Sequence, residues 1–217
     1  MGYDKIKLEN ISLQISQKQI LRNINLSLET GKIHVFFGKS GSGKTSILNI
    51  LNFLYTPSTG RVYYNDIIVN IDDENQINAL RCSELAYFQQ EMAFIENLTS
   101  IENLEIFAKI KKVSLDVETI ENYAKKLNIF NLLQENISVL SGGERQRAAF
   151  LKLLALPSQV VLIDEPTNNL DKENVDFIIQ GIQVMKAQRK TIIIASHSEA
   201  ILNIADFVHL MEDINEI

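Results

Sequence analysis

An eight-residue stretch from Gly38 to Thr45 has the residue types that bind phosphate groups. It reads Gly-Lys-Ser-Gly-Ser-Gly-Lys-Thr and fits the pattern G-x-x-x-x-G-K-[ST]. Its glycines let the backbone curl so that successive N–H groups point inward at an anion, with no Cβ to block the approach. We expect Lys44 to reach the outer two phosphates of a triphosphate and the Thr45 hydroxyl to ligate Mg²⁺. The alternative, a glycine-rich turn that matches by accident, is disfavoured by the strand before it and the helix after it.

Two carboxylates, Asp164 and Glu165, follow the four apolar residues Val160–Ile163. A buried parallel strand of this kind delivers its C-terminal end to the ligand crevice of an α/β sheet. We expect Asp164 to hold the Mg²⁺ shell. Glu165 should point to the opposite side and polarise a water molecule for in-line attack on phosphorus. A strand followed by an ordinary polar turn is the alternative, and the position downstream of a phosphate-binding loop favours the chemical role.

A second glycine-containing turn, Leu140–Glu144, reads Leu-Ser-Gly-Gly-Glu and leads into a helical pattern. The N-terminus of a helix is an anion site, and one triphosphate does not need two such sites from one subunit. The second site makes sense if it serves a nucleotide held by a partner. Its other reading, a capped helix start, is compatible with this role.

The segments around these residues predict an α/β fold. Short alternating segments near the N-terminus predict an antiparallel β-region, and apolar strands that alternate with helices predict a mainly parallel sheet covered on both faces. From about residue 90 to 139 the strand signals disappear, and Thr99 with Glu102 forms a helix-capping box. We therefore expect one domain over 1–217, with a nucleotide-binding core of 1–89 and 140–217 and an inserted α-helical subdomain of 90–139. The expected strands are Ile6–Leu8, Ile11–Ile15, Ile24–Leu28, Ile33–Phe37, the pair Arg61–Tyr64 and Ile67–Ile71, Leu85–Phe88, Val160–Ile163, Thr191–Ala195 and Phe207–Met211. The expected helices are Ser46–Leu54, Asp72–Ser83, Thr99–Lys112, Leu115–Leu127, Ile129–Leu133, Ser141–Leu156, Asp171–Arg189 and Ser198–Ile204.

Composition narrows the class of protein. The 217 residues are 46% hydrophobic and 22% charged, with a formal net charge of −6, which is ordinary for a globular domain and argues against a nucleic-acid partner. The single cysteine, Cys82, cannot form an internal disulfide, so we expect a reducing compartment. The first residues lack the apolar stretch of a signal peptide, and no apolar run approaches the length of a membrane span. If the protein works at a membrane, another chain supplies the spans.

In order and over essentially the whole chain, these motifs resemble the nucleotide-binding subunit of ATP-binding cassette (ABC) transporters. Gly38–Thr45 matches the Walker A loop of that family, Gln90 its Q-loop glutamine, and Leu140–Glu144 its signature sequence. Asp164 and Glu165 match the Walker B pair, residues 168–171 the D-loop, and His197 the switch histidine. A lone histidine is more often structural, but one just past a buried strand and downstream of these motifs fits a sensor of the γ-phosphate.

The resemblance implies a mechanism. Two cassettes pair head to tail, with each ATP between the Walker A loop of one subunit and the signature of the other, so that Ser141 and Gly143 contact the γ-phosphate in trans. Glu165 acts as general base on water, while Gln90 and His197 sense the γ-phosphate and the metal. The nucleotide-binding set is then Gly38, Lys39, Ser40, Gly41, Ser42, Gly43, Lys44, Thr45, Ser46, Ile15, Ser141, Gly142, Gly143 and Asp171, and Mg²⁺ is held by Thr45, Gln90 and Asp164.

Ile15 is included in that set because of its position in the chain, although it has no aromatic ring. An aromatic residue in the N-terminal β-region of the family usually stacks on the adenine, and Ile15 is the matching position here. Residues 10–19 contain no aromatic side chain. We therefore expect modest ATP affinity and weak discrimination against GTP.

The resemblance also implies partners. They are a second ABC ATPase subunit and an integral membrane permease, whose cytoplasmic helix docks on the helical insertion near Phe94, Ile95 and Leu98. The chain would then lie at the cytoplasmic face of the membrane. Residues 79–81 and 95–104 are similar to the macrolide-exporter and lipoprotein-release group, to which bacteriocin exporters also belong. The alternatives are an ABC ATPase outside transport, such as an assembly-type ATPase, and a mechanical coupler that drives a membrane protein without moving a substrate.

Overall fold

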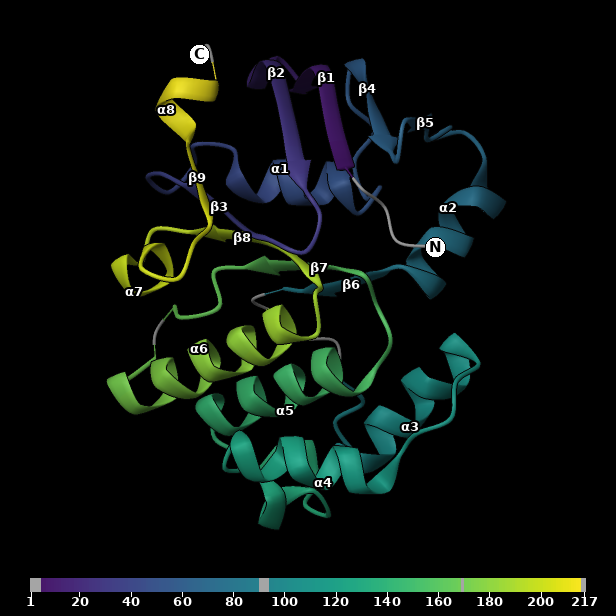
Figure 1. Cartoon of the computed structure of the whole chain (residues 1–217), viewed down its shortest axis with the longest axis vertical. Coiled ribbons are helices and arrows are strands. Elements are labelled where there is room, and N and C mark those ends of the chain that lie inside the picture. Colours follow the sequence, from purple (N-terminus) through teal and green to yellow (C-terminus); the bar gives the residue numbers. More distant parts are fainter. Residues whose placement is uncertain (1–4, 90–93, 169, 216–217) are drawn as a thin grey trace.

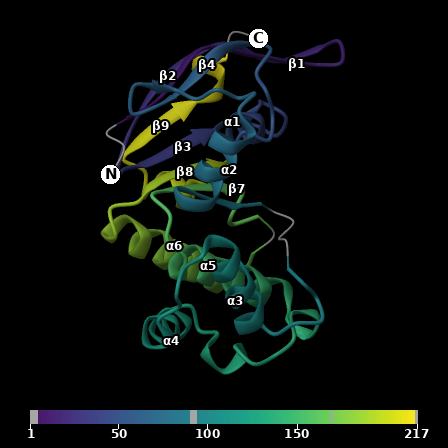
Figure 2. The ribbon, with the colours of Figure 1, turned by 90° about the vertical axis from the view of Figure 1, so that its right-hand side faces the viewer.

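Two β-sheets form the frame of the computed structural model, which describes residues 5–89, 94–168 and 170–215. One is a parallel sheet in the strand order β6-β7-β8-β3-β9, and the other an antiparallel sheet in the order β2-β1-β4-β5. The antiparallel sheet and α1 lie on one side of the parallel sheet, and α5 and α6 lie on the other (Figures 1 and 2). The parallel strands are β3 (Ile33–Phe37), β6 (Leu85–Phe88), β7 (Val160–Asp164), β8 (Thr191–Ser196) and β9 (Phe207–Leu210).

The parallel sheet is buried on both faces because successive side chains of a strand point in opposite directions. Val161 and Ile163 of β7 pack into the apolar cluster that contains the inner sides of α5 and α6. Leu162, between them, packs into a second cluster with α1 and the antiparallel sheet. The predicted mainly parallel sheet, its two covered faces and the antiparallel N-terminal region are therefore confirmed.

The antiparallel sheet differs from the prediction in the length of its strands. Three short N-terminal segments were expected, whereas the structure has two long strands, β1 (Lys5–Ile15) and β2 (Lys18–Glu29). The predicted pair that follows them is confirmed as β4 (Thr59–Tyr64) and β5 (Ile67–Ile68), although β5 is shorter than expected. Asn10 adopts a left-handed backbone with φ of 50°, and its N–H donates to Oδ1 of Asn25 over 2.9 Å. The backbone bulges here, and β1 continues past the polar residues between Leu8 and Ile11. The apolar/polar alternation is broken at these residues, so the sequence predicted two separate segments.

The helices follow the predicted order, with three corrections. The capping box of Thr99 and Glu102 is confirmed at the start of α3. The predicted helix Ile129–Leu133 is only a short 3₁₀ turn at Phe130–Leu132, a second 3₁₀ turn covers Ile137–Val139, and a short helix follows the last strand where none was predicted. The α-helices are α1 (Lys44–Leu51), α2 (Glu74–Ser83), α3 (Ser100–Lys111), α4 (Val117–Lys126), α5 (Gly142–Ala155), α6 (Lys172–Ala187), α7 (Glu199–Leu202) and α8 (Met211–Ile214).

The region between β6 and α5 is helical in the part that the structure describes, residues 94–139, apart from one isolated bridge between Thr99 and Asn136. Its helices α3 and α4 lie farthest from the antiparallel sheet (Figures 1 and 2). Lys111 at the end of α3 ties it to the core, since its Nζ donates to the carbonyls of Cys82 over 2.9 Å and Leu85 over 3.0 Å. We propose residues 90–139 as a subdomain on this basis. None of the described helices is long and apolar enough to span a membrane.

Candidate nucleotide-binding site

The glycine loop lies between β3, which ends at Phe37, and α1, which begins at Lys44. Gly43 precedes the helix with a φ of 98°, a conformation that favours glycine. A Cβ at Gly43 would also lie 2.7 Å from Cδ2 of Leu21 on β2. The predicted order of strand, loop and helix is therefore confirmed, and β2 lies so close to the loop that a side chain at Gly43 would displace Leu21.

Lys44 is folded back against this loop. Its side chain is 5% exposed, and its Nζ donates to the carbonyl oxygens of Gly38 over 2.8 Å and Lys39 over 3.0 Å. The same Nζ lies 3.4 Å from Oε1 of Glu165. The ammonium group is thus held between the loop and the carboxylate, where it can meet an incoming phosphate.

Thr45 and Asp164 form a candidate Mg²⁺ site. The Thr45 hydroxyl donates to Oδ1 of Asp164 over 3.0 Å, and burial, more than the neighbouring Glu165, raises the pKa of the Asp164 carboxyl. Mg²⁺ prefers oxygen ligands and usually takes one or two carboxylates together with water and substrate phosphates. No group of three or more His, Cys, Asp or Glu side chains suited to a metal occurs in the described part of the chain. A buried carboxylate beside a hydroxyl fits Mg²⁺ bound together with a triphosphate.

Glu165 has an unusual backbone. Its φ is 45°, a left-handed conformation that is strained for a residue with a side chain and that clusters at functional sites. Its N–H donates to the carbonyl of Ala195 at the end of β8 over 2.9 Å, which holds the strained turn in place. Its carboxylate faces Lys44 and also Nδ1 of His197, which lies 3.0 Å from Oε2. The structure therefore brings Glu165 and His197 together, beside the loop lysine.

The second glycine turn begins α5. Ser141 caps this helix, and its N–H donates to Oε2 of Glu144 over 2.8 Å, which completes a capping box. A Cβ at Gly142 would meet open space, whereas one at Gly143 would lie 2.7 Å from Oδ1 of Asn174 on α6. Gly143 thus has a packing role, the close approach of α6, that sequence reasoning missed.

The two anion sites of one chain do not meet. Helix α1, which carries Lys44, and helix α5, which starts after Ser141, cover opposite faces of the parallel sheet (Figure 1). Asp171 lies at the start of α6, where its side chain caps the helix by accepting from the N–H of Asn174 over 2.8 Å. Gln90 lies outside the described residues, as does Asn169 of the predicted D-loop.

Comparison with known proteins decides the family. The sequence model of the ABC transporter family matches residues 21–168. The macrolide export ATP-binding/permease protein MacB of Campylobacter jejuni is 33% identical over 199 residues, which are 90% of this chain and 31% of MacB. The lipoprotein-releasing system ATP-binding protein LolD of Saccharophagus degradans is 32% identical over 198 residues, 89% of this chain and 86% of LolD. The chain belongs to the ABC transporter family.

The solved structures agree with this assignment. The ABC transporter cassette MJ0796, solved as a dimer, has a TM-score of 0.84 at 26% identity, over 94% of this chain and 93% of that one. A second structure of MJ0796 captures a post-hydrolysis state with ADP and phosphate, and its TM-score is 0.82. This chain is therefore an ABC cassette with ATPase activity, and the resemblance to the macrolide-export and lipoprotein-release group is confirmed. The cassette spans 31% of the length of MacB.

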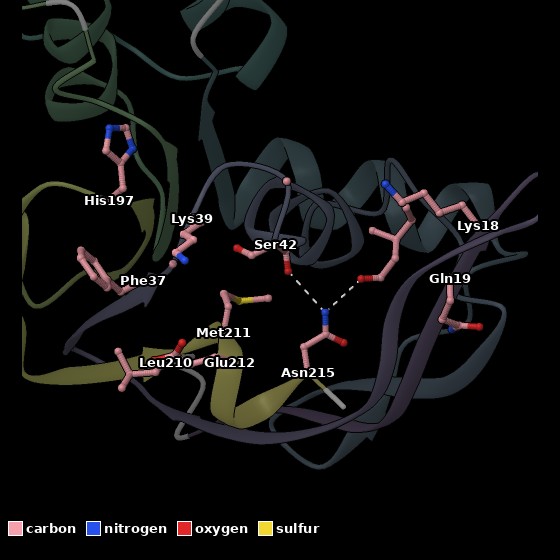
Figure 3. Close-up of a pocket in the computed structure, with 13 residues that line it drawn as sticks. Lys18, Gln19, Phe37, Lys39, Ser42, His197, Leu210, Met211, Glu212 and Asn215 are labelled. Carbon is pink, nitrogen blue, oxygen red and sulfur yellow. Dashed lines mark hydrogen bonds between the residues drawn. The ribbon is translucent and has the colours of Figure 1, made fainter. Parts of the chain in front are cut away.

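A cavity of about 510 Å³ lies beside the phosphate loop of the cassette (Figure 3). The loop residues Gly38 and Ser42 line it together with Ile20 of β2 and Met211 of α8. His197 and the loop residues Lys39 and Gly41 also line it, whereas Lys44, Thr45, Asp164 and Glu165 do not. The cavity therefore shares part of its lining with the predicted nucleotide-binding set. Ile15, at the end of β1, is 44% exposed and does not line the cavity either. No sequence motif marked Met211 or Asn215, which close one side of this cavity.

Proposed function

We propose that the cassette hydrolyses ATP at a site shared between two copies and thereby powers a membrane transporter. The observation that carries the shared site is the separation of the two anion-binding turns on opposite faces of one sheet. A triphosphate on the Lys44 side of one copy cannot reach Ser141 of the same copy. Ser141 and Gly142 of the signature turn are exposed, so they are free to face the nucleotide of a second copy.

Within one copy, we assign the phosphates to the loop amides and side chains from Gly38 to Ser46, with Lys44 leaving its carbonyl partners to meet them. Thr45 and Asp164 would hold Mg²⁺, together with Gln90 from the segment before the helical region. The ion would neutralise charge on the β- and γ-phosphates.

For the reaction, the Glu165 carboxylate accepts a proton from a water molecule as the water oxygen bonds to the γ-phosphorus. The bond from that phosphorus to the bridging oxygen breaks, which leaves ADP and phosphate. His197, 3.0 Å from the same carboxylate, orients it and faces the γ-phosphate. Ser141, Gly142, Gly143 and Asp171 of the second copy complete the site.

A substitution at Ser141 tests the shared site. Ser141→Arg should leave ATP binding by the monomer unchanged, because the Walker A loop is in the same chain, and should abolish ATP-driven dimerisation by crowding the second anion site. Isothermal titration calorimetry and size-exclusion chromatography measure the two effects. The control is Asn203→Ala, at an exposed residue directly after α7. A loss of monomer affinity as large as that of Lys44→Ala would mean that both turns serve one nucleotide in cis.

The transport role rests on the relatives. MacB and LolD carry the names of a macrolide exporter and a lipoprotein-releasing system. From this similarity we propose export of a peptide, drug or lipid-like substrate, with a bacteriocin as one candidate. The partner would be a membrane permease that places the cassette at the cytoplasmic face of the membrane. Ile95, 47% exposed after the Q-loop, is a candidate contact. The net charge of the whole chain, −6, disfavours a nucleic-acid partner.

Purification of the cassette from detergent-solubilised membranes tests this part. We expect a multi-span protein to accompany the wild-type chain, and Ile95→Asp to weaken that association without changing ATP hydrolysis by the isolated cassette. Recovery of the cassette without any membrane protein would favour an ABC ATPase outside transport.

A further inference from the structure

Asn215 joins two parts of the cassette that are far apart in the sequence. Its Oδ1 accepts from the N–H of Arg22 over 2.9 Å, and its Nδ2 donates to the carbonyl oxygens of Ile20 over 3.0 Å and Ser42 over 3.3 Å. Figure 3 draws both donated bonds. The side-chain amide thereby spans from the edge strand β2 to the phosphate loop.

Met211 packs behind the same loop and supports this contact. It is 2% exposed, and a Cβ at Gly38 would lie 3.0 Å from the Cβ of Met211 and equally close to Oγ of Ser42. A Cβ at Gly43 would lie 3.5 Å from Cε of Met211. Helix α8 and Asn215 therefore contact the loop where both line the cavity, and Lys44 and Asp164 do not line it.

Peptide geometry explains what this contact does. In a planar trans peptide the carbonyl and the following N–H point in opposite directions. The Ser42 carbonyl is aimed at Asn215, so the N–H of Gly43 in the same peptide is aimed away from it. An amide directed to the other side of the loop is what a phosphate needs, and a glycine-rich loop without such a contact is free to rotate that peptide.

We propose that Asn215 is a positioning residue for the phosphate loop, which holds the Ser42–Gly43 peptide in the orientation that binds nucleotide phosphates. The proposal rests on the proposed function of this loop as the phosphate site. The new element is that Asn215, in the segment after the last strand, controls the affinity of the loop for any ligand with a di- or triphosphate group. Hydrogen bonds to Arg22 and Ile20 of β2 hold the side-chain amide in place, and its hydrogen bond to the Ser42 carbonyl orients the loop peptide.

Two substitutions of Asn215 weaken its contact with the Ser42 carbonyl to different degrees. Asn215→Ala removes it, whereas Asn215→Asp keeps an acceptor for Arg22 and places a carboxylate against the carbonyls of Ile20 and Ser42. Loss of one hydrogen bond of about 0.5–1.5 kcal/mol corresponds to a change of roughly 2- to 12-fold in a binding constant. We expect the dissociation constants of ATP and ADP with Mg²⁺ to rise about 3- to 10-fold in Asn215→Ala and further in Asn215→Asp.

Inorganic tripolyphosphate, which has no base, is the deciding probe. If Asn215 orients the loop, tripolyphosphate affinity should fall by the same factor as ATP affinity. KM for ATP should rise while kcat at saturation stays within about twofold, because the loop binds the ground state and the transition state alike. Asn203→Ala serves as the control, and the melting temperature of each variant is measured alongside. Asn215→Ala alone carries the test if Asn215→Asp does not fold.

Three results would overturn the proposal. Unchanged affinities in a folded Asn215→Ala would leave Asn215 a merely structural residue. Weaker binding of ATP and ADP with unchanged tripolyphosphate binding would mean that α8 contacts the base. An equal loss of kcat and kcat/KM would move the effect to the transition state. If the wild-type cassette itself bound none of the three ligands, the proposed function would fail, independently of Asn215.

Discussion

Replacing Glu165 by glutamine separates proton transfer from binding. Glutamine has nearly the same volume, and its amide can still contact Nζ of Lys44 and Nδ1 of His197, which lie 3.4 Å and 3.0 Å from the carboxylate oxygens. It cannot accept a proton from water. The left-handed backbone at this position, with φ of 45°, is equally available to glutamine. The substitution therefore removes one chemical property of the site and leaves its geometry.

The expected effect follows from this. A positioned general base contributes typically about 10²- to 10⁴-fold to a rate, so kcat should fall by that factor, roughly 3–5 kcal/mol in activation free energy. The dissociation constant of ATP should not rise, because the variant removes a negative charge close to the expected position of the γ-phosphate, beside Lys44. ATP closes the dimer and hydrolysis opens it, so the ATP-bound dimer of Glu165→Gln should persist.

Two assays follow the two consequences. Release of phosphate under saturating ATP measures kcat, and size-exclusion chromatography with ATP and Mg²⁺ measures the dimer. Glu199→Gln, two residues after His197 and on α7, is the matched control and should hydrolyse ATP like the wild type. A Glu165→Gln variant that stays monomeric and keeps near wild-type turnover would refute the assignment of Glu165 as general base.

Three further predictions concern other parts of the cassette. Ile15→Tyr should tighten ATP binding several-fold, because the ring can stack on the base, a contact worth about 1–3 kcal/mol in single-stranded nucleic-acid proteins. Calorimetry with ATP and GTP on the wild type and the variant checks this. A strong wild-type preference for ATP that the variant leaves unchanged would contradict it. Gly143→Ala should destabilise the fold by about 1–3 kcal/mol, because the new Cβ displaces the Asn174 side chain 2.7 Å away; urea unfolding measures this, and an unchanged midpoint would show that Asn174 moves at no cost. Burial, and then His34 nearby, lowers the pKa of His209 to about 4, while an unfolded histidine titrates near 6.5, so the folded cassette binds fewer protons and loses stability as the pH falls from about 6.5 to 4. His209→Phe should make that loss shallower in urea unfolding across this range, and equal slopes would exclude His209 as its source.

Local sequence was sufficient wherever neighbouring residues make the structure. The phosphate loop was predictable because its glycines, Lys44 and the flanking strand and helix are contiguous. The capping boxes at Thr99 and Ser141 were predictable because each joins residues three apart. Prediction was wrong at the end of the chain, where α8 follows β9 (Phe207–Leu210), because four residues carry too little periodicity to identify a helix.

The residue pattern by itself determined the α/β class, the order of the elements, the phosphate loop and the carboxylate pair after β7. Only the tertiary structure decided that Glu165 has a left-handed backbone beside Lys44 and His197, and that the Asn174 side chain of α6 lies against Gly143. It also decided that Asn215 holds a loop 173 positions earlier in the chain. The physical reason is that a motif records contacts between neighbours in sequence, whereas these contacts depend on how sheets and helices pack. No periodicity of the chain encodes which residue of one element will face a given atom of another.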